Sequence, residues 1–498
     1  MNSRKIDRKD FLHLGGKLSL GALIAPALLT GCLSDSKEKE KERKIIKISG
    51  NANTKYILKN GIVYSQDVKV GNFRKADILI EGKIIKEIKP DIEQGEDTYV
   101  IDASEYIIMP GFVDTHHHQY ETAIRGYLAE ALLVNDKKPD NPFTYLDVLI
   151  KKLTPVFRPE DIYTAVLLSS LNQIDCGVTT VLDTSQVVHS MEHFEALMHG
   201  LKDGGRRALV AFSTGSGEST PFPRKLNDIQ KMYFSSTDQL LTMAMGAELF
   251  PGDFKNHWGM ARDIGVPIVS HIVGNLGSAP AFENIVKENL LGKDNILIHC
   301  TGLNDKVWES IAKSGAAISL AVPIELSMRH GTPPIMQALK HGVQPSLSSD
   351  VEVTMTSDFF TQMRSVYTLQ RGLVNAQVLS GIDCQQDLIT CNDVVRYATL
   401  EGAKATHLEH KIGSLTPGKE ADIIMLRTRD LNVMPINSVS GTVVTLMERT
   451  NVDTVIIAGK IRKYQGKMLG IDTQVLHSKI TESRDYLFAK AGLENHFF

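Results

Sequence analysis

The middle of the chain alternates short apolar runs with helical segments, and this alternation restricts the fold more than any other feature. Each run is rich in apolar and β-branched residues but too short for a helix, which is typical of a buried parallel strand. The runs are YIIMPGFVDTH, GVTTVLDTS, RRALVAFSTG, LLTMAMGAE, VPIVSHIVG, NILIHCTG, GAAISLAVP and VQPSLSSD. Eight strands, each followed by a helical or irregular segment, predict a (β/α)8 TIM barrel over residues 109–412. A doubly wound open sheet is the alternative.

The helical segments between the runs carry start and stop signals. Pro159 stands in the first turn of a segment that ends at Gly177. Asn304 is placed to cap a segment that stops at Gly315. Only residues 215–254 lack a clear helical pattern.

Both ends of the expected barrel are flanked by short strands separated by turns. The segment ADILIEGKIIKEIKP alternates around Glu81 and Gly82, which is typical of a hairpin. Residues 53–108 and 413–475 are therefore expected to pair into one small β-sandwich domain of an α/β protein. The last segment, residues 476–498, is interpreted as a C-terminal helix.

Residues 1–32 have the anatomy of an export signal, with a basic start, an apolar centre and small residues before a cysteine. The ending LLTGC resembles a bacterial lipobox, which implies that Cys32 is lipidated. A twin-arginine (Tat) signal is also suggested, but Lys9 stands where the second arginine is usual, so the export route stays open. Residues 33–52 are interpreted as a charged disordered tether. We expect an exported bacterial lipoprotein of the cell envelope, either periplasmic or on the outer face of the membrane. An N-terminal membrane anchor or a buried helix is the alternative.

Charge and cysteine content exclude two classes of protein. A formal net charge of -3 provides no basic surface for nucleic acid. Five cysteines among 498 residues do not make a disulfide-stapled scaffold. Cys384 and Cys391 could form a local disulfide in an exported protein, or remain free thiols.

Metal-ligating side chains stand where the expected strands end. Reactive groups of a barrel gather at the carboxyl ends of its strands, so these residues are expected at one rim. They come from the first, fifth, sixth and eighth runs: His116, His117, His118, His271, His299 and Asp350.

Strand alternation separates the three consecutive histidines. His116 and His118 are expected on one face, and His117 on the other, where it would pack between barrel and helix. Together with His271 and Asp350, His116 and His118 would form a shell of three nitrogens and one oxygen. Such a shell suits Zn²⁺ or Fe²⁺ and leaves a position for water, whose pKa the ion lowers toward neutrality.

The run MPGFVDTHHH, the later strand-end residues and the C-terminal segment LTPGKEADIIML together resemble the amidohydrolase superfamily. The branch that is most similar holds cytosine deaminase, S-adenosylhomocysteine deaminase and triazine hydrolases such as atrazine chlorohydrolase. The resemblance implies metal binding by His116, His118, His271 and Asp350, and a contact of His299 with substrate or attacking water. Binuclear members use a carboxylated lysine after the fourth strand. TMAMGAELF has no lysine, which favours one metal ion, Zn or Fe.

The sequence departs from this branch after the fifth strand. Its deaminases usually have His-x-x-Glu there, and the glutamate shuttles protons. Here Gly274 takes the place of that glutamate. Asp350 as base and His299 as proton donor are the expected catalytic residues, and Glu325 or Glu352 could bring a further carboxylate to the mouth.

Three residues are predicted to bind substrate. Glu121, three positions beyond the second expected ligand, would favour a substrate with N–H groups or positive charge. Arg125 matches a common Leu-Arg-Gly of the resembled branch; the alternative is a structural pair with a barrel carboxylate. Glu325 lies on the loop after the seventh strand, with His330 nearby.

These features predict a mononuclear metal-dependent amidohydrolase for a small-molecule substrate. Metal-activated water would attack a C–N bond, either deaminating an amino-heterocycle or hydrolysing an amide or cyclic amidine. The alternative is a degenerate lipoprotein of the same fold that binds metal or a small ligand without turnover. The resemblance also implies a homodimer, and the only membrane contact expected is the lipid anchor.

Overall fold

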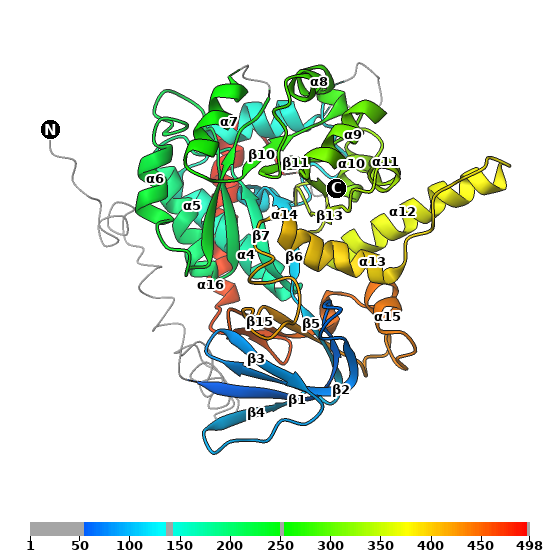
Figure 1. Ribbon diagram of the computed structural model, residues 1–498. Coiled ribbons are helices and arrows are strands. Elements are labelled where there is room, and N and C mark those ends of the chain that lie inside the picture. The colour runs from blue at the N-terminus through cyan, green and yellow to red at the C-terminus, as the bar shows by residue number, and fades with distance from the viewer. Residues whose placement is uncertain (1–53, 136–142, 250–252, 496–498) are drawn as a thin grey trace.

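The computed structural model describes residues 54–135, 143–249 and 253–495, and its centre is a parallel β-barrel (Figure 1). The expected export signal, Cys32 and nearly all of the tether lie outside the described residues. Eight parallel strands follow one another in chain order. They are β6 (Phe112–His117), β7 (Val178–Thr184), β8 (Arg207–Phe212), β9 (Leu241–Gly246), β10 (Ile268–His271), β11 (Asn295–Ile298), β12 (Ala317–Leu320) and β13 (Ser346–Leu347).

The barrel closes where its last strand meets its first. His117 and Asp350 form a parallel bridge. The His118 N–H donates to the Asp350 carbonyl at 2.9 Å, and the Asp350 N–H donates to the His116 carbonyl at 3.0 Å. The predicted barrel is thus confirmed, and the open-sheet alternative is wrong.

Helices cover the outside of the barrel. The main ones are α4 (Pro159–Asp175), α5 (Met191–Gly204), α6 (Leu226–Tyr233), α7 (Phe254–Asp263), α8 (Ala279–Lys287), α9 (Asp305–Ser314), α10 (Val322–Ser327), α11 (Ile335–Lys340), α12 (Phe359–Leu379) and α13 (Cys391–Arg396). Asn304 caps α9 as predicted, because its side chain accepts the Val307 N–H. The poorly patterned region contains the short α6.

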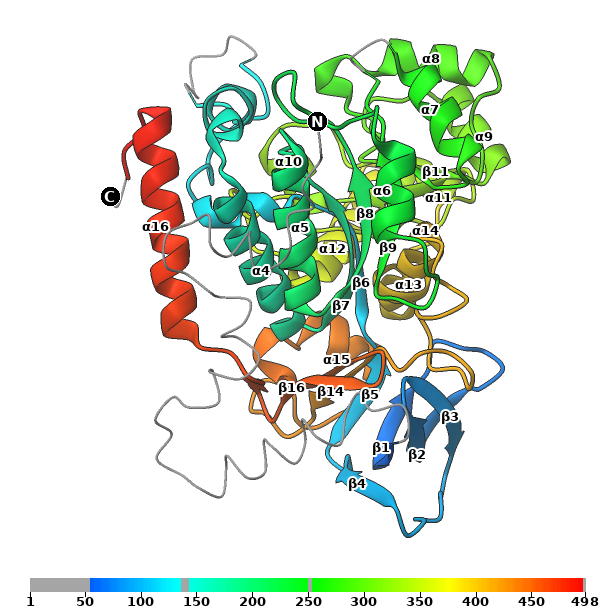
Figure 2. The same ribbon diagram turned by 90° about the vertical axis from the view of Figure 1, so that its left-hand side faces the viewer.

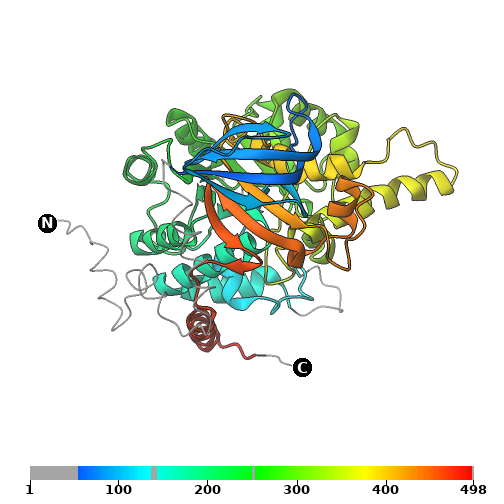
Figure 3. The same ribbon diagram turned by 90° about the horizontal axis from the view of Figure 1, so that it is seen from below.

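Strands from both ends of the described chain combine into one smaller domain, which lies below the barrel in Figure 1 and faces the viewer in Figure 3. Its strands form a single nine-stranded mixed sheet with its own apolar core. They are β1 (Lys55–Tyr64), β2 (Asn72–Glu81), β3 (Ile84–Lys89), β4 (Thr98–Asp102), β5 (Tyr106–Pro110), β14 (Ile423–Arg427), β15 (Val452–Ile457), β16 (Lys460–Tyr464) and β17 (Lys467–Met468). The two chain halves join where β5 pairs with β14, which confirms the expected small domain built from both ends.

Charged side chains tie this sheet to the barrel. Arg207 of β8 is 1% exposed and contacts Glu420 at 2.7 Å and Asp422 at 3.0 Å. A buried guanidinium needs such partners, because an unpaired charge is strongly penalised by desolvation.

The C-terminal helix α16 (Thr473–Ala491) runs along the flank of the barrel beside α4 (Figure 2). Its Ser483 hydroxyl donates to Asp161 at 2.8 Å. Cys384 and Cys391 are free thiols. Within the described ranges, no helix combines the length and hydropathy needed to cross a bilayer.

Candidate metal centre

The candidate metal centre lies at the seam where β13 meets β6. The closing hydrogen bonds of the barrel involve His116, His118 and Asp350 themselves. Asp350 has φ 57° and His299 has φ 68°, a left-handed backbone that non-glycine residues rarely adopt. Such conformations persist where the surrounding structure determines them and concentrate at functional sites.

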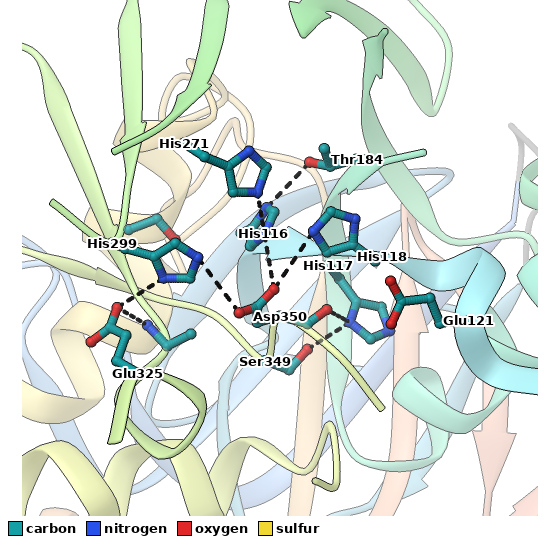
Figure 4. A network of polar contacts seen from close by, with 12 residues as sticks. His116, His117, His118, Glu121, Thr184, His271, His299, Glu325, Ser349 and Asp350 are labelled. Atoms are coloured by element: carbon teal, nitrogen blue, oxygen red, sulfur yellow. Dashed lines mark hydrogen bonds and ion pairs between the residues drawn. The ribbon is translucent and has the colours of Figure 1, made fainter. Parts of the chain in front are cut away.

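Four imidazoles surround the Asp350 carboxylate (Figure 4). The His116 Nε2 lies 3.0 Å from Asp350 Oδ1 and 3.1 Å from the His271 Nε2. The His118 Nε2 is 3.6 Å from the same Oδ1, and the His299 Nε2 is 3.6 Å from Oδ2. The ligand atoms fall into two overlapping groups, each within 4.8 Å: His116, His118 and His271, and His116, His299 and Asp350. The predicted ligands therefore converge.

The protonation states suit a divalent cation. Burial lowers the pKa of His116 to about 4 and holds the pKa of His118 well below its usual range. Both rings are therefore neutral at pH 7 and offer lone pairs. Burial alone would raise the pKa of Asp350, but His299, His116 and His118 lower it, so the carboxylate is ionised.

Two buried polar atoms of the centre remain without a hydrogen-bond partner among the described residues. They are the His118 Nδ1 and the Asp350 Oδ2. Buried polar atoms are usually paired, so an unpaired carboxylate oxygen among imidazoles indicates a missing partner. The residues present thus fit Zn²⁺ or Fe²⁺.

His117 points away from the centre, as strand alternation predicts. Its Nδ1 lies 2.8 Å from the Asp350 carbonyl oxygen, and its Nε2 lies 3.0 Å from the Ser169 hydroxyl of α4. The ring therefore packs between barrel and helix.

Glu248, which the sequence analysis missed, supports the expected ligand His271. It stands two residues after β9, and its Oε1 lies 2.7 Å from the His271 Nδ1. Its Oε2 accepts the His271 backbone N–H at 3.0 Å. Burial would raise the pKa of Glu248, but His271 lowers it. The signal in the sequence is the carboxylate at the end of the fourth apolar run, in TMAMGAELF.

Glu325 holds His299 from behind. Its Oε1 lies 3.1 Å from the His299 Nδ1 and accepts the Ala321 N–H at 2.9 Å. Burial raises the pKa of Glu325 well above its usual range. Glu325 does not have the predicted role of a substrate contact, because it is fully buried and does not line the cavity. It orients a residue that does.

Arg125 is also placed away from the cavity. Its Nε donates to Glu352 Oε2 at 2.8 Å, which is the structural pair named as the alternative. Glu352 accepts three more hydrogen bonds and does not point at the mouth; the donors are Thr122, Asn172 and Ser357. The structure therefore does not bring Arg125 to the cavity, because its guanidinium pairs with Glu352 instead.

Glu121 reaches the cavity only through another side chain. It is buried and accepts the Tyr145 hydroxyl at 2.6 Å, and Tyr145 lines the cavity. Burial raises the pKa of Glu121 well above its usual range. The structure thus places Glu121 behind Tyr145 rather than against a ligand.

The centre opens into a cavity of about 310 Å³, a size that suits a small molecule. Its lining combines the centre with apolar side chains and a few polar ones. Outside the centre, it includes Leu133, Tyr145, Leu146, Ile150, Gln186, Thr214, Leu276, Met328 and His330.

Gly274, which takes the place of the glutamate that the resembled branch usually has after the fifth strand, packs closely against the loop after β11. A Cβ at this position would lie 3.0 Å from the Thr301 carbonyl oxygen and 3.1 Å from the Gly302 Cα. Any side chain would therefore require the backbone to move.

Comparisons with known proteins agree with this geometry. A model of the amidohydrolase family matches residues 107–462. The 5'-deoxyadenosine deaminase of Methanosarcina mazei is 25% identical over 88% of this chain and 99% of its own length. The 5-methylthioadenosine/S-adenosylhomocysteine deaminase of Pyrococcus abyssi is 23% identical over 86% of this chain and 98% of its own.

Two solved structures share the fold. An adenosine deaminase from Xanthomonas campestris with bound zinc has a TM-score of 0.76 at 18% identity, over 87% of this chain and 98% of that one. The atrazine chlorohydrolase of Arthrobacter aurescens, complexed with zinc, has a TM-score of 0.75 at 18% identity, over 86% and 100%.

Proposed function

The chain belongs to the amidohydrolase family, and from this premise we propose that it is a single-metal hydrolase that breaks a C–N bond of a small molecule. The observation that carries the proposal is the convergence of His116, His118, His271 and Asp350 at one cavity. No feature of the site supports the alternative of a binding protein without turnover, since the full set of donors is present.

One divalent ion, Zn²⁺ or Fe²⁺, fits the centre. When bound, it would supply Lewis acidity and lower the pKa of a water molecule toward neutrality. The segment after β9 has Glu248 but no lysine that a second ion would require. Both solved neighbours are described with zinc, which supports a metal of this class.

Asp350 and His299 are the residues placed to move protons. Asp350 is ionised and can accept a proton from the attacking water. The His299 Nδ1 faces Glu325, so its Nε2 faces Asp350 and the cavity, where it can polarise the substrate or assist the leaving group. Burial lowers the pKa of His299 to about 4, so the ring is neutral and has one N–H. Burial also raises the pKa of Glu325, and a protonated Glu325 that donates to the Nδ1 leaves this N–H on the Nε2.

The proposed substrate is an amino-heterocycle, with amides and cyclic amidines as further candidates. The names of the relatives point to aminopurine nucleosides as the first class to test. The cavity supports a flat heterocycle, because apolar Leu146, Ile150 and Leu276 are combined with polar Gln186 and Thr214.

The test measures metal and turnover in the same full-length preparation. Metal content is determined by mass spectrometry, and hydrolysis is followed on 5'-deoxyadenosine, S-adenosylhomocysteine, aminopyrimidines, pterins, triazines and N-acyl compounds. We expect about one ion per chain and release of ammonia or amine from one class. His271→Ala should lose both. Stoichiometric metal without hydrolysis of any compound would instead favour the binding protein.

We also propose that the protein is a lipoprotein of the bacterial cell envelope, anchored through Cys32 and paired as a homodimer. The lipobox-like LLTGC supports the anchor. Palmitate labelling of wild-type cells and of Cys32→Ala cells tests it. Palmitate label on Cys32→Ala, or Cys32→Ala that remains in the membrane fraction, would contradict the anchor. The homodimer is tested separately, by sedimentation of the purified protein.

A further inference from the structure

His330 is a buried imidazole in the cavity that the proposed mechanism does not use. It lies between α10 and α11, lines the cavity and is 3% exposed. Its ring meets that of His299 edge-on, with 4.7 Å between centroids. Neither ring nitrogen has a hydrogen-bond partner among the residues that the structure describes. Two unpaired polar atoms at this depth indicate that a ligand or water completes the site.

The backbone of His330 is fastened to the loop after β10. Its carbonyl accepts the Thr301 hydroxyl at 2.9 Å, and the same Thr301 oxygen accepts the Gly274 N–H at 3.0 Å. The Asn275 side chain donates to the Arg329 carbonyl at 2.9 Å. His330 therefore enters the cavity from the side on which Gly274 lies.

Small residues make this docking feasible. A Cβ on Gly331, which has φ 138°, would lie 2.8 Å from the Thr301 Cβ. Gly274 and Gly302 approach so closely that a Cβ on Gly274 would lie 3.1 Å from the Gly302 Cα. The loop that carries His330 thus rests on a junction that tolerates no larger side chains. Gly274, which has no side chain, is therefore part of the junction on which the His330 loop packs.

We propose that His330 is a substrate-contacting residue that hydrogen-bonds a nitrogen or oxygen of the substrate on the side of the cavity where Gly274 contributes no side chain. This inference rests on the proposed function. Burial lowers the pKa of His330 to about 3, so the ring is neutral and has one N–H donor and one lone pair. That pairing capacity suits a heterocycle or amide edge, which itself carries both donors and acceptors.

The test compares His330→Phe, His330→Asn and His330→Gln with the wild type on the panel member that the wild type hydrolyses. Phenylalanine keeps a ring against His299 but cannot hydrogen-bond. We expect it to lower kcat/KM by about 10- to 100-fold, chiefly through a higher KM, because a buried polar group of the substrate is left unpaired. Asn or Gln should restore part of the loss. Metal content and Tm should stay at wild-type values.

The matched control is His341→Phe. His341 ends α11 and faces Asp305 outside the cavity, at 3.5 Å. We expect its kcat/KM to stay within about twofold of the wild type, as for surface changes away from a site.

Four outcomes would overturn the inference. They are an unchanged kcat/KM in His330→Phe, a loss that accompanies loss of metal, a loss that neither Asn nor Gln restores, and a loss equalled by His341→Phe. A wild type that hydrolyses no compound of the panel would overturn the proposed function, and this inference with it. Turnover by the wild type together with unaffected His330 variants would overturn the inference alone.

Discussion

The Glu248 carboxylate accepts two hydrogen bonds from His271, one from the ring Nδ1–H at 2.7 Å and one from the backbone N–H at 3.0 Å. These contacts fix the ring orientation and leave the Nε2 facing His116, 3.1 Å away. A carboxylate behind a ligating histidine sets its tautomer and raises its basicity.

Replacing Glu248 with alanine should weaken metal binding by about 10- to 100-fold, the usual cost of removing such a supporting group. Competition with a chromogenic chelator measures the affinity. Glu283→Ala is the control, because Glu283 only accepts a hydrogen bond from the exposed side chain of Asn304. An affinity equal to that of the wild type in Glu248→Ala would show that His271 needs no support.

The barrel and the four expected ligands could be predicted because they depend on local patterns. Period-two alternation separates His117 from His116 and His118, and the strand ends bring His271 and Asp350 to the same rim. The closure of the barrel fixes these positions, because the Asp350 backbone is hydrogen-bonded to the backbones of His116 and His118.

The surroundings of the centre could not be predicted, because they depend on how loops cross in space. Glu325 and Glu121 follow strands whose ends form the mouth of the barrel, so the sequence favours a place at the mouth for both. In the structure the Glu325 side chain contacts His299, and the Glu121 side chain contacts Tyr145. Arg125 finds Glu352, which lies 227 positions away. Hydrophobic periodicity carries no information about such long-range pairs. It also could not predict that the His330 carbonyl accepts a hydrogen bond from Thr301.

Replacing Glu325 with alanine should lower kcat by about 10- to 100-fold at unchanged metal content, because His299 would lose the partner that orients it. Glu325→Gln keeps a hydrogen-bonding side chain beside the His299 Nδ1 and the Ala321 N–H, so we expect a smaller loss. Steady-state kinetics with parallel metal analysis decides the matter. Equal losses in both variants would argue against an orienting role.

Replacing Arg125 with methionine should destabilise the fold without changing KM. Burial would raise the pKa of Glu352, and Arg125 is the first group that lowers it. The Arg125 side chain is 35% exposed and Glu352 is buried, so the expected cost is about 1 kcal/mol, between that of a surface pair and that of a fully buried one. Urea unfolding measures the free energy. The control Arg262→Met removes a surface pair with Asp294 and a hydrogen bond to the Leu290 carbonyl, both away from the cavity. A raised KM at wild-type stability would restore the substrate-contact interpretation.

Asp175 should make stability depend on acid pH. It ends α4 and contacts Lys463 of the small sheet at 2.8 Å and Arg449 at 2.5 Å. Burial would raise its pKa, but Lys463 and Arg449 lower it, so the folded state holds the carboxylate more ionised than the unfolded state does. The unfolded chain therefore binds more protons in acid, and stability from this group is present above the unfolded pKa of about 3.9. It is lost as the pH falls through the lower folded pKa.

Asp175→Asn should consequently be less stable than the wild type at pH 7, and the difference should shrink below about pH 4. Urea unfolding at pH 7, 5, 4 and 3 measures both proteins. Asp228→Asn, an exposed position on α6 that contacts Lys225, should stay within about 0.5 kcal/mol of the wild type at pH 7. A difference for Asp175→Asn that is constant over the whole range would mean that the carboxylate is held by its shape and hydrogen bonds rather than by its charge.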